Sequence, residues 1–252
     1  MRLLPSVKTV SIILPAFNEA ATIDEVLRGI LEIAPGRKPE ENWEILVVDD
    51  GSEDDTASIA ERDGVRVIRH PYNIGNGAAV KTGLRRASGR WVVMMDADGQ
   101  HDPGDIARLW EHRERYDMVV GARTRASKTS AHRSLANRVY SLLASYVTRF
   151  PVQDLTSGFR LVARETARRY LYLLPNTFSY PSTITMAYLR SGKSIRYIPV
   201  TTGARTGSSK IKLLEDGTRF FLIILKIATF YSPLRIFLPV SLLFFLTGLC
   251  YY

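Results

Sequence analysis

The sequence predicts an α/β fold in which a mostly parallel β-sheet carries helices on both faces. The first observation is a set of short, continuous apolar runs, rich in valine and isoleucine, that lack the alternating polar residues of a one-sided strand. Runs of this kind are typical of strands that are buried on both faces. The second observation is that segments with helical periodicity separate these runs, which indicates crossover connections between parallel strands.

Strands and helices are expected to alternate along the first half of the chain. The strands are expected at 10–17, 43–50, 65–70, 91–98 and 116–123. The helices between them are expected at 22–34, 56–61, 77–87 and 103–115. Polar clusters follow several of these strands, and such sheets bind ligands beyond the carboxyl ends of their strands. The strand ends are therefore expected to form one shared site.

The composition limits the classes of partner. The 252 residues, 46% of them hydrophobic, suffice for a large core. The one cysteine, Cys250, provides neither a disulfide framework nor a cysteine-based metal site. The net charge of +9 indicates an anionic partner, which could be nucleic acid, a phosphorylated small molecule or a lipid surface. Nucleic acid ranks last because no recognised nucleic-acid-binding motif is present, and nothing in the sequence fixes the oligomeric state.

The segments after residue 123 differ in character from the expected sheet. Residues 132–150 are amphipathic, basic and aromatic, which is typical of a helix that lies on a membrane surface or packs on its own domain. Residues 212–230 form a second candidate. Residues 236–252 are 17 residues without a charge, where a bilayer span needs about 20. We expect the start of a transmembrane helix at 233–252, with a buried C-terminal helix as the alternative.

An acidic cluster follows the apolar run that begins at Trp91. Asp96 and Asp98 would point to the same side if the extended strand geometry continued through them. Hard oxygen ligands of this kind suit Mg²⁺ or Mn²⁺, and Mg²⁺ is usually held by one or two carboxylates together with substrate phosphates. Asp102 stands directly before Pro103, which is the pattern of a helix cap. The cluster therefore predicts a site for a metal diphosphate, with Asp102 as a capping residue.

Six motifs occur in an order that resembles a known enzyme family. They are ILPAFNEA (13–20), VVDDGSEDDT (47–56), NIGNGAAVKTGLRRASG (73–89), MDADGQHDP (95–103), GAR (121–123) and QDLTSGFRLVAR (153–164). Together they resemble the family 2 glycosyltransferases, and within that family the polyprenol-phosphate branch typified by dolichol-phosphate mannose synthase. The resemblance covers about residues 8 to 212. It implies a GT-A, Rossmann-like fold.

The resemblance assigns candidate roles to individual residues. The nucleotide sugar would be bound by Pro15, Phe17, Asn18, Glu19, Asp50, Asp96, Ala97, Arg205 and Lys210. The metal ion, Mg²⁺ or Mn²⁺, would be held by Asp98 and Gln100. The acceptor phosphate would be approached by Arg123, Arg133 and Asn137. Asp98, Asp154 and Arg123 would be the catalytic residues, with Asp154 acting as a base or as an orienting group.

The resemblance also implies an activity and a domain organisation. The expected reaction is the inverting transfer of a hexose from a nucleotide-diphosphate sugar to a polyprenyl or dolichyl monophosphate, with GDP-mannose favoured and UDP-glucose next. A catalytic domain would occupy 1–211, a membrane-interface helix 212–232 and a partial transmembrane segment 233–252. Basic residues precede the apolar end of the chain, which places the catalytic domain at the cytoplasmic face of a membrane.

Several alternatives stay open at this point. The acceptor could instead be a soluble or oligosaccharide hydroxyl, in which case Asp154 must be a true base. A membrane-tethered binding module without catalysis is disfavoured by the intact carboxylates. Lys81 could be a solvated helix residue or a donor contact, and Arg160 could be the ion-pair partner of Asp154. The glycines Gly51, Gly75 and Gly77 are expected in turns, and His101 in a turn or in packing behind the metal motif.

Overall fold

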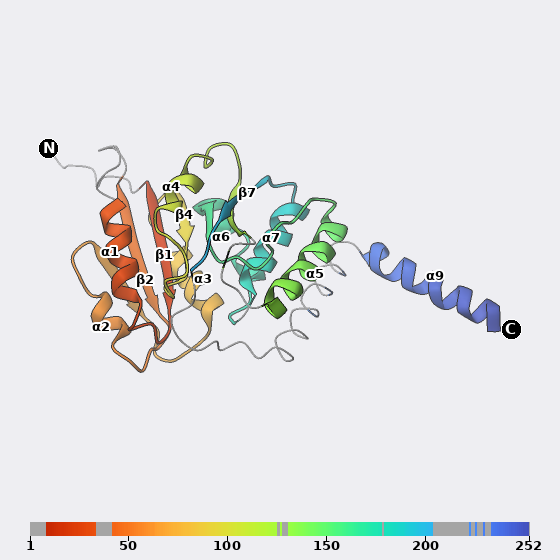
Figure 1. Ribbon diagram of the computed structural model, residues 1–252, viewed down its shortest axis with the longest axis horizontal. Coiled ribbons are helices and arrows are strands. Elements are labelled where there is room, and N and C mark those ends of the chain that lie inside the picture. Colours follow the sequence, from red (N-terminus) through yellow and green to blue (C-terminus); the bar gives the residue numbers. More distant parts are fainter. Residues whose placement is uncertain are drawn as a thin grey trace.

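A seven-stranded mixed sheet forms the centre of the protein (Figure 1). The computed structural model describes residues 9–33, 42–124, 127, 131–177, 179–203, 222, 225, 229 and 233–251, with the side chains of 131–136, 235 and 236 outside this description. The strand order is β3-β2-β1-β4-β6-β5-β7. The strands are β1 Val10–Ala16, β2 Trp43–Asp49, β3 Val65–Arg69, β4 Trp91–Met94, β5 Met118–Arg123, β6 Arg160–Ala163 and β7 Ile195–Val200.

Helices cover both faces of the sheet, as predicted. The helices are α1 Ile23–Ile33, α2 Thr56–Ala60, α3 Asn76–Arg86, α4 Asp105–Trp110, α5 Ala131–Thr148, α6 Arg164–Arg168, α7 Tyr180–Arg190 and α9 Pro233–Tyr251, with a 3-10 turn η1 at Leu171–Leu173. One apolar core lies between the sheet and α3, α5, α6 and α7. The other lies between the sheet and α1, α2 and α4. Two apolar cores require strands that are buried on both faces, which explains their continuous apolar runs.

Strand β6 is the exception to the parallel arrangement. It pairs antiparallel with β4 on one side and with β5 on the other. Because of this reversal, the segment that precedes β6 emerges at the edge where the parallel strands end. The pairing of Val120 with Arg160 places the start of β6 near the end of β5. The loop that contains Asp154 therefore reaches the same edge as the residues after β1, β2, β3 and β4.

The end of β4 corrects one sequence-based argument. A strand was expected over 91–98, but β4 ends at Met94. Gly99 adopts a left-handed backbone with φ of 71°, and the Oδ1 atom of Asp98 accepts a hydrogen bond of 3.2 Å from the N–H of Gln100. The chain therefore leaves the strand after Met94 and bends at 97–99. The condition under which Asp96 and Asp98 would point to the same side, an extended strand that continues through them, is not met, because β4 stops before them.

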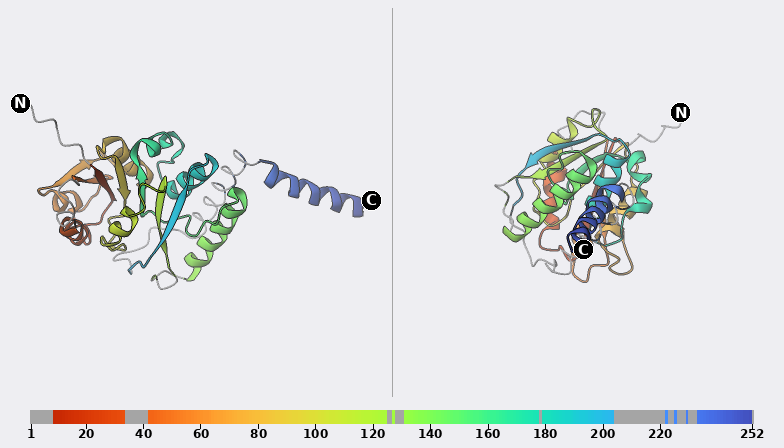
Figure 2. Two further views of the ribbon diagram at one scale, coloured as in Figure 1. Left: turned by 90° about the horizontal axis from the view of Figure 1, so that it is seen from above. Right: turned by 90° about the vertical axis from the view of Figure 1, so that its right-hand side faces the viewer.

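The C-terminal helix α9 stands apart from the sheet in Figure 1 and in the left view of Figure 2. Its large apolar side chains are exposed, with Phe244 at 72%. In the part of the chain that the structure describes, no helix combines the length and apolar character that a membrane crossing requires. The expected transmembrane segment at 233–252 is therefore not supported. Most of the expected interface helix at 212–232 lies outside the described residues.

Candidate active site

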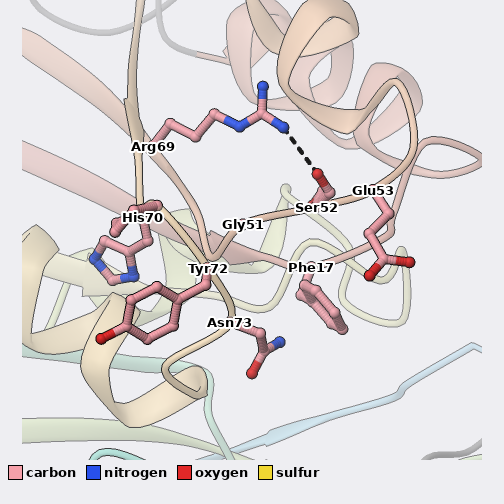
Figure 3. A pocket seen from close by; sticks show the side chains of 9 residues that line it. Phe17, Gly51, Ser52, Glu53, Arg69, His70, Tyr72 and Asn73 are labelled. Carbon is pink, nitrogen blue, oxygen red and sulfur yellow. Dashed lines mark hydrogen bonds between the residues drawn. The ribbon is translucent and has the colours of Figure 1, made fainter.

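A hollow of about 620 Å³ lies at the ends of β1, β2 and β3 (Figure 3). Its lining residues come from three loops and are Phe17, Gly51, Ser52, Glu53, Arg69, His70, Pro71, Tyr72 and Asn73. Arg69 closes one side, because its Nη2 donates a 2.8 Å hydrogen bond to the carbonyl oxygen of Ser52. Volumes of this size are typical of small-ligand sites. Of the residues expected at the nucleotide, Phe17 lines this hollow.

Asn18 and Glu19 join the loop after β1 to the loop after β2. The N–H of Asn18 donates to Oγ of Ser52, and its Oδ1 accepts from the N–H of Glu53, each at 2.9 Å. The N–H of Glu19 donates to Oγ1 of Thr56 at 2.8 Å. Asn18 has a φ of 55°, a left-handed conformation that asparagine tolerates better than most residues. These bonds fix the wall that carries Phe17.

Pro15 precedes this wall inside β1. It is buried and pairs with Val48 of β2. Its position in the strand sets the direction in which the chain leaves the sheet toward Phe17.

Asp50 holds the loop between β3 and α3. Its carboxylate accepts hydrogen bonds from the N–H groups of Ile74 and Gly75, at 3.1 and 2.7 Å. Nδ1 of His70 lies 2.6 Å from Oδ1 of Asp50, and Nε2 of His70 lies 2.9 Å from Oγ1 of Thr82. Asp50 is 2% exposed and is not among the residues that line the hollow. Its observed partners therefore belong to the loop that forms one wall.

Sequence reasoning missed the residues of this wall. Arg69 is the last residue of β3, and His70, Pro71, Tyr72 and Asn73 follow it directly. The signal was available, because this run follows an apolar strand just as the other polar clusters do.

The acidic loop after β4 is fixed at two points. The carbonyl oxygen of Ala97 accepts a 2.8 Å hydrogen bond from Oγ1 of Thr22, at the start of α1. The carbonyl oxygen of Gln100 accepts from the N–H of Gly203 at 2.8 Å, and the side-chain Nε2 of Gln100 donates to the carbonyl oxygen of Gly203 at 3.3 Å. The loop is thus held between α1 and the chain that follows β7. Asp98 is 7% exposed, and Asp96 is partly exposed.

Asp102 and His101 complete this loop. Oδ1 of Asp102 accepts a 2.8 Å hydrogen bond from the N–H of Gly104 and so closes the turn before α4. The prediction that Asp102 is the N-cap is wrong, because α4 begins at Asp105 and its N-cap residue is Gly104. The His101 ring packs on Phe159 with ring centroids 4.9 Å apart, and its buried Nδ1 has no hydrogen-bond partner among the described residues. Burial lowers the pKa of His101 to about 4, although the charge of Asp98 opposes this. The imidazole is therefore neutral near pH 7.

Arg123 and Asp154 form a buried ion pair at the end of β5. Nε of Arg123 donates to Oδ2 of Asp154 at 2.7 Å, and Nη2 donates to Oδ1 at 2.8 Å. Asp154 is 1% exposed, whereas the Arg123 side chain is 30% exposed. Burial alone would raise the pKa of Asp154, but the hydrogen bonds and the charge of Arg123 outweigh burial and hold it below the usual 3.8. Burial would likewise lower the pKa of Arg123, but Asp154 first and Asp96 second raise it.

Backbone and side-chain donors occupy the rest of the Asp154 carboxylate. Its Oδ1 accepts hydrogen bonds from the N–H groups of Thr156 and Ser157, both at 3.1 Å, and from Nδ2 of Asn137 at 3.2 Å. Its Oδ2 accepts a further bond from the N–H of Arg123 at 3.1 Å. Asn137, expected at the acceptor phosphate, also accepts a 2.9 Å hydrogen bond from the Thr156 hydroxyl. Asp154 is therefore saturated with donors.

The suggested ion pair between Arg160 and Asp154 is wrong. Arg160 is fully buried and donates to the carbonyl oxygens of Ser157 and Leu155, at 2.6 and 3.3 Å, and to Oγ1 of Thr185 at 2.7 Å. These bonds fix the loop that carries Asp154. Arg123 pairs with the Asp154 carboxylate because Arg123 and Asp154 both lie at the edge of the sheet, whereas Arg160 points into the core.

Lys81 and Gly77 of α3, together with Gly75 directly before this helix, hold a distant loop. Nζ of Lys81 donates to the carbonyl oxygen of Leu174 at 3.1 Å and to Oδ1 of Asn176. Gly75 has a φ of 122°, and a Cβ at this position would lie 2.6 Å from the carbonyl oxygen of Asn176. The N–H of Gly77 donates to the carbonyl oxygen of Thr177 at 3.1 Å. Gly75 is thus in a turn as expected, and Gly77 permits a close backbone approach.

Three expected site residues cannot be placed. Arg205 and Lys210 lie outside the described residues, and so does the side chain of Arg133. Their roles stay predictions. Of the remaining candidates, Asp96, Asp98 and Gln100 share one loop, and Arg123, Asn137 and Asp154 share one hydrogen-bonded cluster.

The family of the chain follows from its sequence pattern. The pattern of Glycosyl transferase family 2 matches residues 11–171, which span β1 to η1. The chain belongs to this family. It is therefore a glycosyltransferase. The matched region contains the hollow, the acidic loop and the Arg123–Asp154 pair.

Relatives of this glycosyltransferase include one uncharacterized protein and one that is named for its activity. An uncharacterized protein of Methanocaldococcus jannaschii is 31% identical over 201 residues, covering 76% of this chain and 80% of the relative. A dolichyl-phosphate beta-glucosyltransferase of Trichomonas vaginalis is 29% identical over 248 residues, covering 88% of this chain and 73% of the relative.

A solved structure shares the fold of this glycosyltransferase. Glucosyl-3-phosphoglycerate synthase from Mycobacterium tuberculosis, determined with Mn²⁺ and uridine-diphosphate-glucose, matches with a TM-score of 0.69 at 24% identity. The match covers 88% of this chain and 79% of the synthase. The expected GT-A, Rossmann-like fold is confirmed by this likeness together with the mixed sheet.

Proposed function

We propose that this glycosyltransferase transfers a hexose from a nucleotide-diphosphate sugar to a polyprenyl or dolichyl monophosphate. The observation that carries the proposal is the saturated carboxylate of Asp154. Both of its oxygens accept hydrogen bonds from Arg123, and Oδ1 accepts further bonds from the N–H groups of Thr156 and Ser157. A carboxylate with a lowered pKa and this many donors is a poor proton acceptor. The acceptor should therefore bring its own negative charge.

A phosphate monoester meets this requirement. Its second pKa is about 6, so its oxygen is ionised at pH 7 without help from a base. An uncharged hydroxyl would need a base near its proton, and Asp154 is occupied by Arg123. A phosphate needs cations instead. The Arg123 side chain is 30% exposed and presents a guanidinium, which suits phosphate oxygens, at the rim of the site.

The donor diphosphate would be held at the acidic loop. Asp98 and Gln100 offer carboxylate and amide oxygens, the ligands that Mg²⁺ and Mn²⁺ prefer, while Asp96 would lie against the nucleotide sugar. Within the described residues, no group of three or more histidine, cysteine, aspartate or glutamate side chains could hold a metal ion. A site with one or two carboxylates still suits a metal that substrate phosphates also ligate. When bound, such an ion would neutralise the leaving diphosphate.

The protein's own residues would organise both substrates. The hollow lined by Phe17, Arg69 and Tyr72 would take the nucleoside, while the acidic loop beside it would take the diphosphate. Asp154 would orient Arg123 toward the acceptor phosphate. An in-line arrangement of acceptor and leaving group would invert the anomeric centre, as expected from the resemblance.

Exposed apolar side chains support a membrane-bound acceptor. Val139, Leu142 and Tyr146 of α5 are 46%, 64% and 57% exposed. They are spaced by three and four residues and therefore lie on one face of the helix. Helix α9 adds a second exposed apolar surface. We propose that the catalytic domain lies at the cytoplasmic face of a membrane, because basic residues precede the apolar end of the chain.

The identity of the sugar rests on the relatives. The sequence put GDP-mannose first and UDP-glucose second. The relatives from Trichomonas vaginalis are named dolichyl-phosphate beta-glucosyltransferases, which favours UDP-glucose as the first donor to test.

A soluble acceptor is the second candidate. The likeness in fold to glucosyl-3-phosphoglycerate synthase favours it, because that enzyme was also solved in complex with phosphoglyceric acid. Its acceptor would share the negative charge of a lipid phosphate but not the lipid chain.

A transfer assay tests the proposal directly. The full chain in membranes is incubated with Mn²⁺ and radiolabelled UDP-glucose or GDP-mannose. Polyprenyl phosphate, polyprenol of the same length and phosphoglycerate are offered in separate reactions. We expect label in the organic phase with polyprenyl phosphate and none with polyprenol. Transfer to phosphoglycerate alone would establish the second candidate, and equal transfer to polyprenol would refute the argument from Asp154.

A further inference from the structure

We propose that Tyr180 is a positioning residue that fixes the carboxylate of Asp96 through the backbone of Gly158. The inference rests on the proposed function, in which Asp96 lies against the nucleotide sugar. No motif in the sequence pointed to Tyr180, which lies on α7, far along the chain from the acidic loop. The evidence is the packing beneath Asp96.

Gly158 forms the floor under the Asp96 carboxylate. A Cβ atom at Gly158 would lie 2.8 Å from Oδ2 of Asp96 and 3.2 Å from the hydroxyl oxygen of Tyr180. Real Cβ atoms do not approach an oxygen to 2.8 Å, so the carboxylate rests directly on the glycine. The backbone of Gly158 is outside the left-handed region, because its φ is not positive. A Cβ atom at this position would therefore displace the Asp96 carboxylate.

Tyr180 supports this floor from below. Its side chain is 2% exposed, and its hydroxyl donates a 3.3 Å hydrogen bond to the carbonyl oxygen of Gly158. Burial raises the pKa of Tyr180 far above its usual value, and the negative charge of Asp96 raises it further. The hydroxyl therefore keeps its proton and stays a donor near the carboxylate. The ring is held by the core that contains Ile184 and Met186 of the same helix.

The arrangement places Asp96 between two fixed groups. Below it lie Gly158 and the Tyr180 hydroxyl. The positive charge of Arg123 acts on it as well, because Asp96 contributes to the raised pKa of Arg123. A carboxylate limited in this way has few available positions, so a donor that contacts it binds without first ordering it. A change at Gly158 or Tyr180 that frees the Asp96 carboxylate should weaken donor binding more than acceptor binding.

Two substitutions test the floor, and one controls for burial. Tyr180→Phe removes the hydroxyl and keeps the ring, whereas Gly158→Ala pushes a methyl group against Asp96. Tyr188→Phe is the matched control, because Tyr188 is also buried on α7 and its hydroxyl has no hydrogen-bond partner among the described residues. Each variant is measured for donor KM, lipid-phosphate KM, kcat and melting temperature.

We expect Tyr180→Phe to raise the donor KM by about fivefold, the equivalent of one lost hydrogen bond. Gly158→Ala should raise it by about tenfold or more, since the carboxylate itself must move. The KM for the lipid-phosphate acceptor should change by less than about twofold in both variants. Tyr188→Phe should leave the donor KM unchanged. A donor KM in Tyr180→Phe equal to that of Tyr188→Phe would overturn the proposal, and so would a lowered melting temperature with no change in donor KM.

A binding experiment separates this inference from the proposed reaction. Calorimetric titration of UDP-glucose in the presence of Mn²⁺ needs no acceptor. If the wild-type chain binds the donor but transfers nothing to lipid phosphate, the proposed function fails while the ratio of dissociation constants still tests Tyr180. The same titration in an Asp96→Ala background gives the final check. There the methyl group of Gly158→Ala meets no carboxylate, so a further loss of affinity would contradict a role through Asp96.

Discussion

Nε and Nη2 of Arg123 bind the two carboxylate oxygens of Asp154 at 2.7 and 2.8 Å. This two-point geometry fixes the plane of the guanidinium relative to the carboxylate. Asp154 is buried, while the Arg123 side chain retains some exposure. The pair therefore presents a cation, not a base, to whatever binds at the end of β5.

Removal of the Asp154 charge should impair use of the acceptor. In Asp154→Asn the guanidinium loses its charged partner, so we expect kcat/KM for polyprenyl phosphate to fall at least about tenfold while the donor KM changes little. Steady-state kinetics with each substrate varied in turn measures this. Asp117→Asn is the control, because Asp117 pairs with Lys193 at the far end of β5. A rate that recovers as the pH is raised would mean that Asp154 acts as a base.

The same pair predicts a pH dependence of stability. Arg123 outweighs burial and holds the pKa of Asp154 below 3.8. Such a carboxylate stabilises the fold above its unfolded pKa and loses this contribution as the pH falls through its folded pKa. The free energy of unfolding should differ between wild type and Asp154→Asn by about 3 kcal/mol, constant from about pH 5 to about pH 8. Urea unfolding should show this difference shrinking only below about pH 4. A difference that declines between neutral pH and about pH 5 would contradict the lowered pKa.

Loss of the Asp98 carboxylate should abolish metal-dependent transfer. Asp98→Asn keeps the shape of the side chain and removes its charge, so we expect no activity at Mn²⁺ concentrations that saturate the wild type. Transfer of label and Mn²⁺ titration with chelator-treated protein measure this. Asp102→Asn, in the same loop, should stay active because Asp102 closes the turn before α4. Undiminished turnover in Asp98→Asn would reject the metal role.

The bond between Asp50 and His70 should matter for nucleotide binding. His70→Phe removes both imidazole contacts, to Asp50 and to Thr82, and frees the loop that forms one wall of the hollow. We expect the dissociation constant of the nucleoside diphosphate to rise about tenfold, as for the loss of a hydrogen bond to a charged group. Calorimetry measures this, with His112→Phe, outside the hollow, as the control. Unchanged affinity would assign the pair to fold stability alone.

Lys81 should stabilise the fold without touching the donor. Lys81→Met removes hydrogen bonds to Leu174 and Asn176, so we expect a loss of about 1 kcal/mol in unfolding free energy. The donor KM should stay the same. Arg85→Met, one turn further along α3, controls for loss of a surface charge. A raised donor KM in Lys81→Met alone would restore the alternative in which Lys81 contacts the donor.

The first five strands could be predicted because each is rich in apolar residues, although Arg66 interrupts the run in the edge strand β3. Strands β6 and β7 were not predicted, because the apolar run of β6 has only three residues between Arg160 and Arg164, and the exposed residues Arg196 and Pro199 interrupt β7. Helix α7 was not predicted because several of its buried residues are polar. Ser182, Thr183 and Thr185 are buried, and they interrupt the apolar periodicity by which a helix is recognised in a sequence. Pairing partners of short elements are set by tertiary packing.

The site was predictable as a set of residues but not as a set of bonds. Arg123 and Asp154 were both expected there, yet their pairing depends on the reversal of β6, which no local pattern signals. Asp50 was expected at the nucleotide, and its partners turned out to be His70 and two backbone N–H groups. Which donor reaches a carboxylate is decided by loops that meet only in the folded chain.

The reversed direction of β6 has a consequence for how this enzyme type can diversify. The chain leaves the sheet at Arg123 and comes back to the same edge at Asp154, so the ion pair joins the two ends of segment 124–153, which contains α5. The entropy cost of closing such a segment grows only slowly with its length. The chain on either side of α5 can therefore change in length while the ion pair and the packing of Ala144 and Val147 in the core stay in place, which allows new acceptors to be accommodated without rebuilding the donor half.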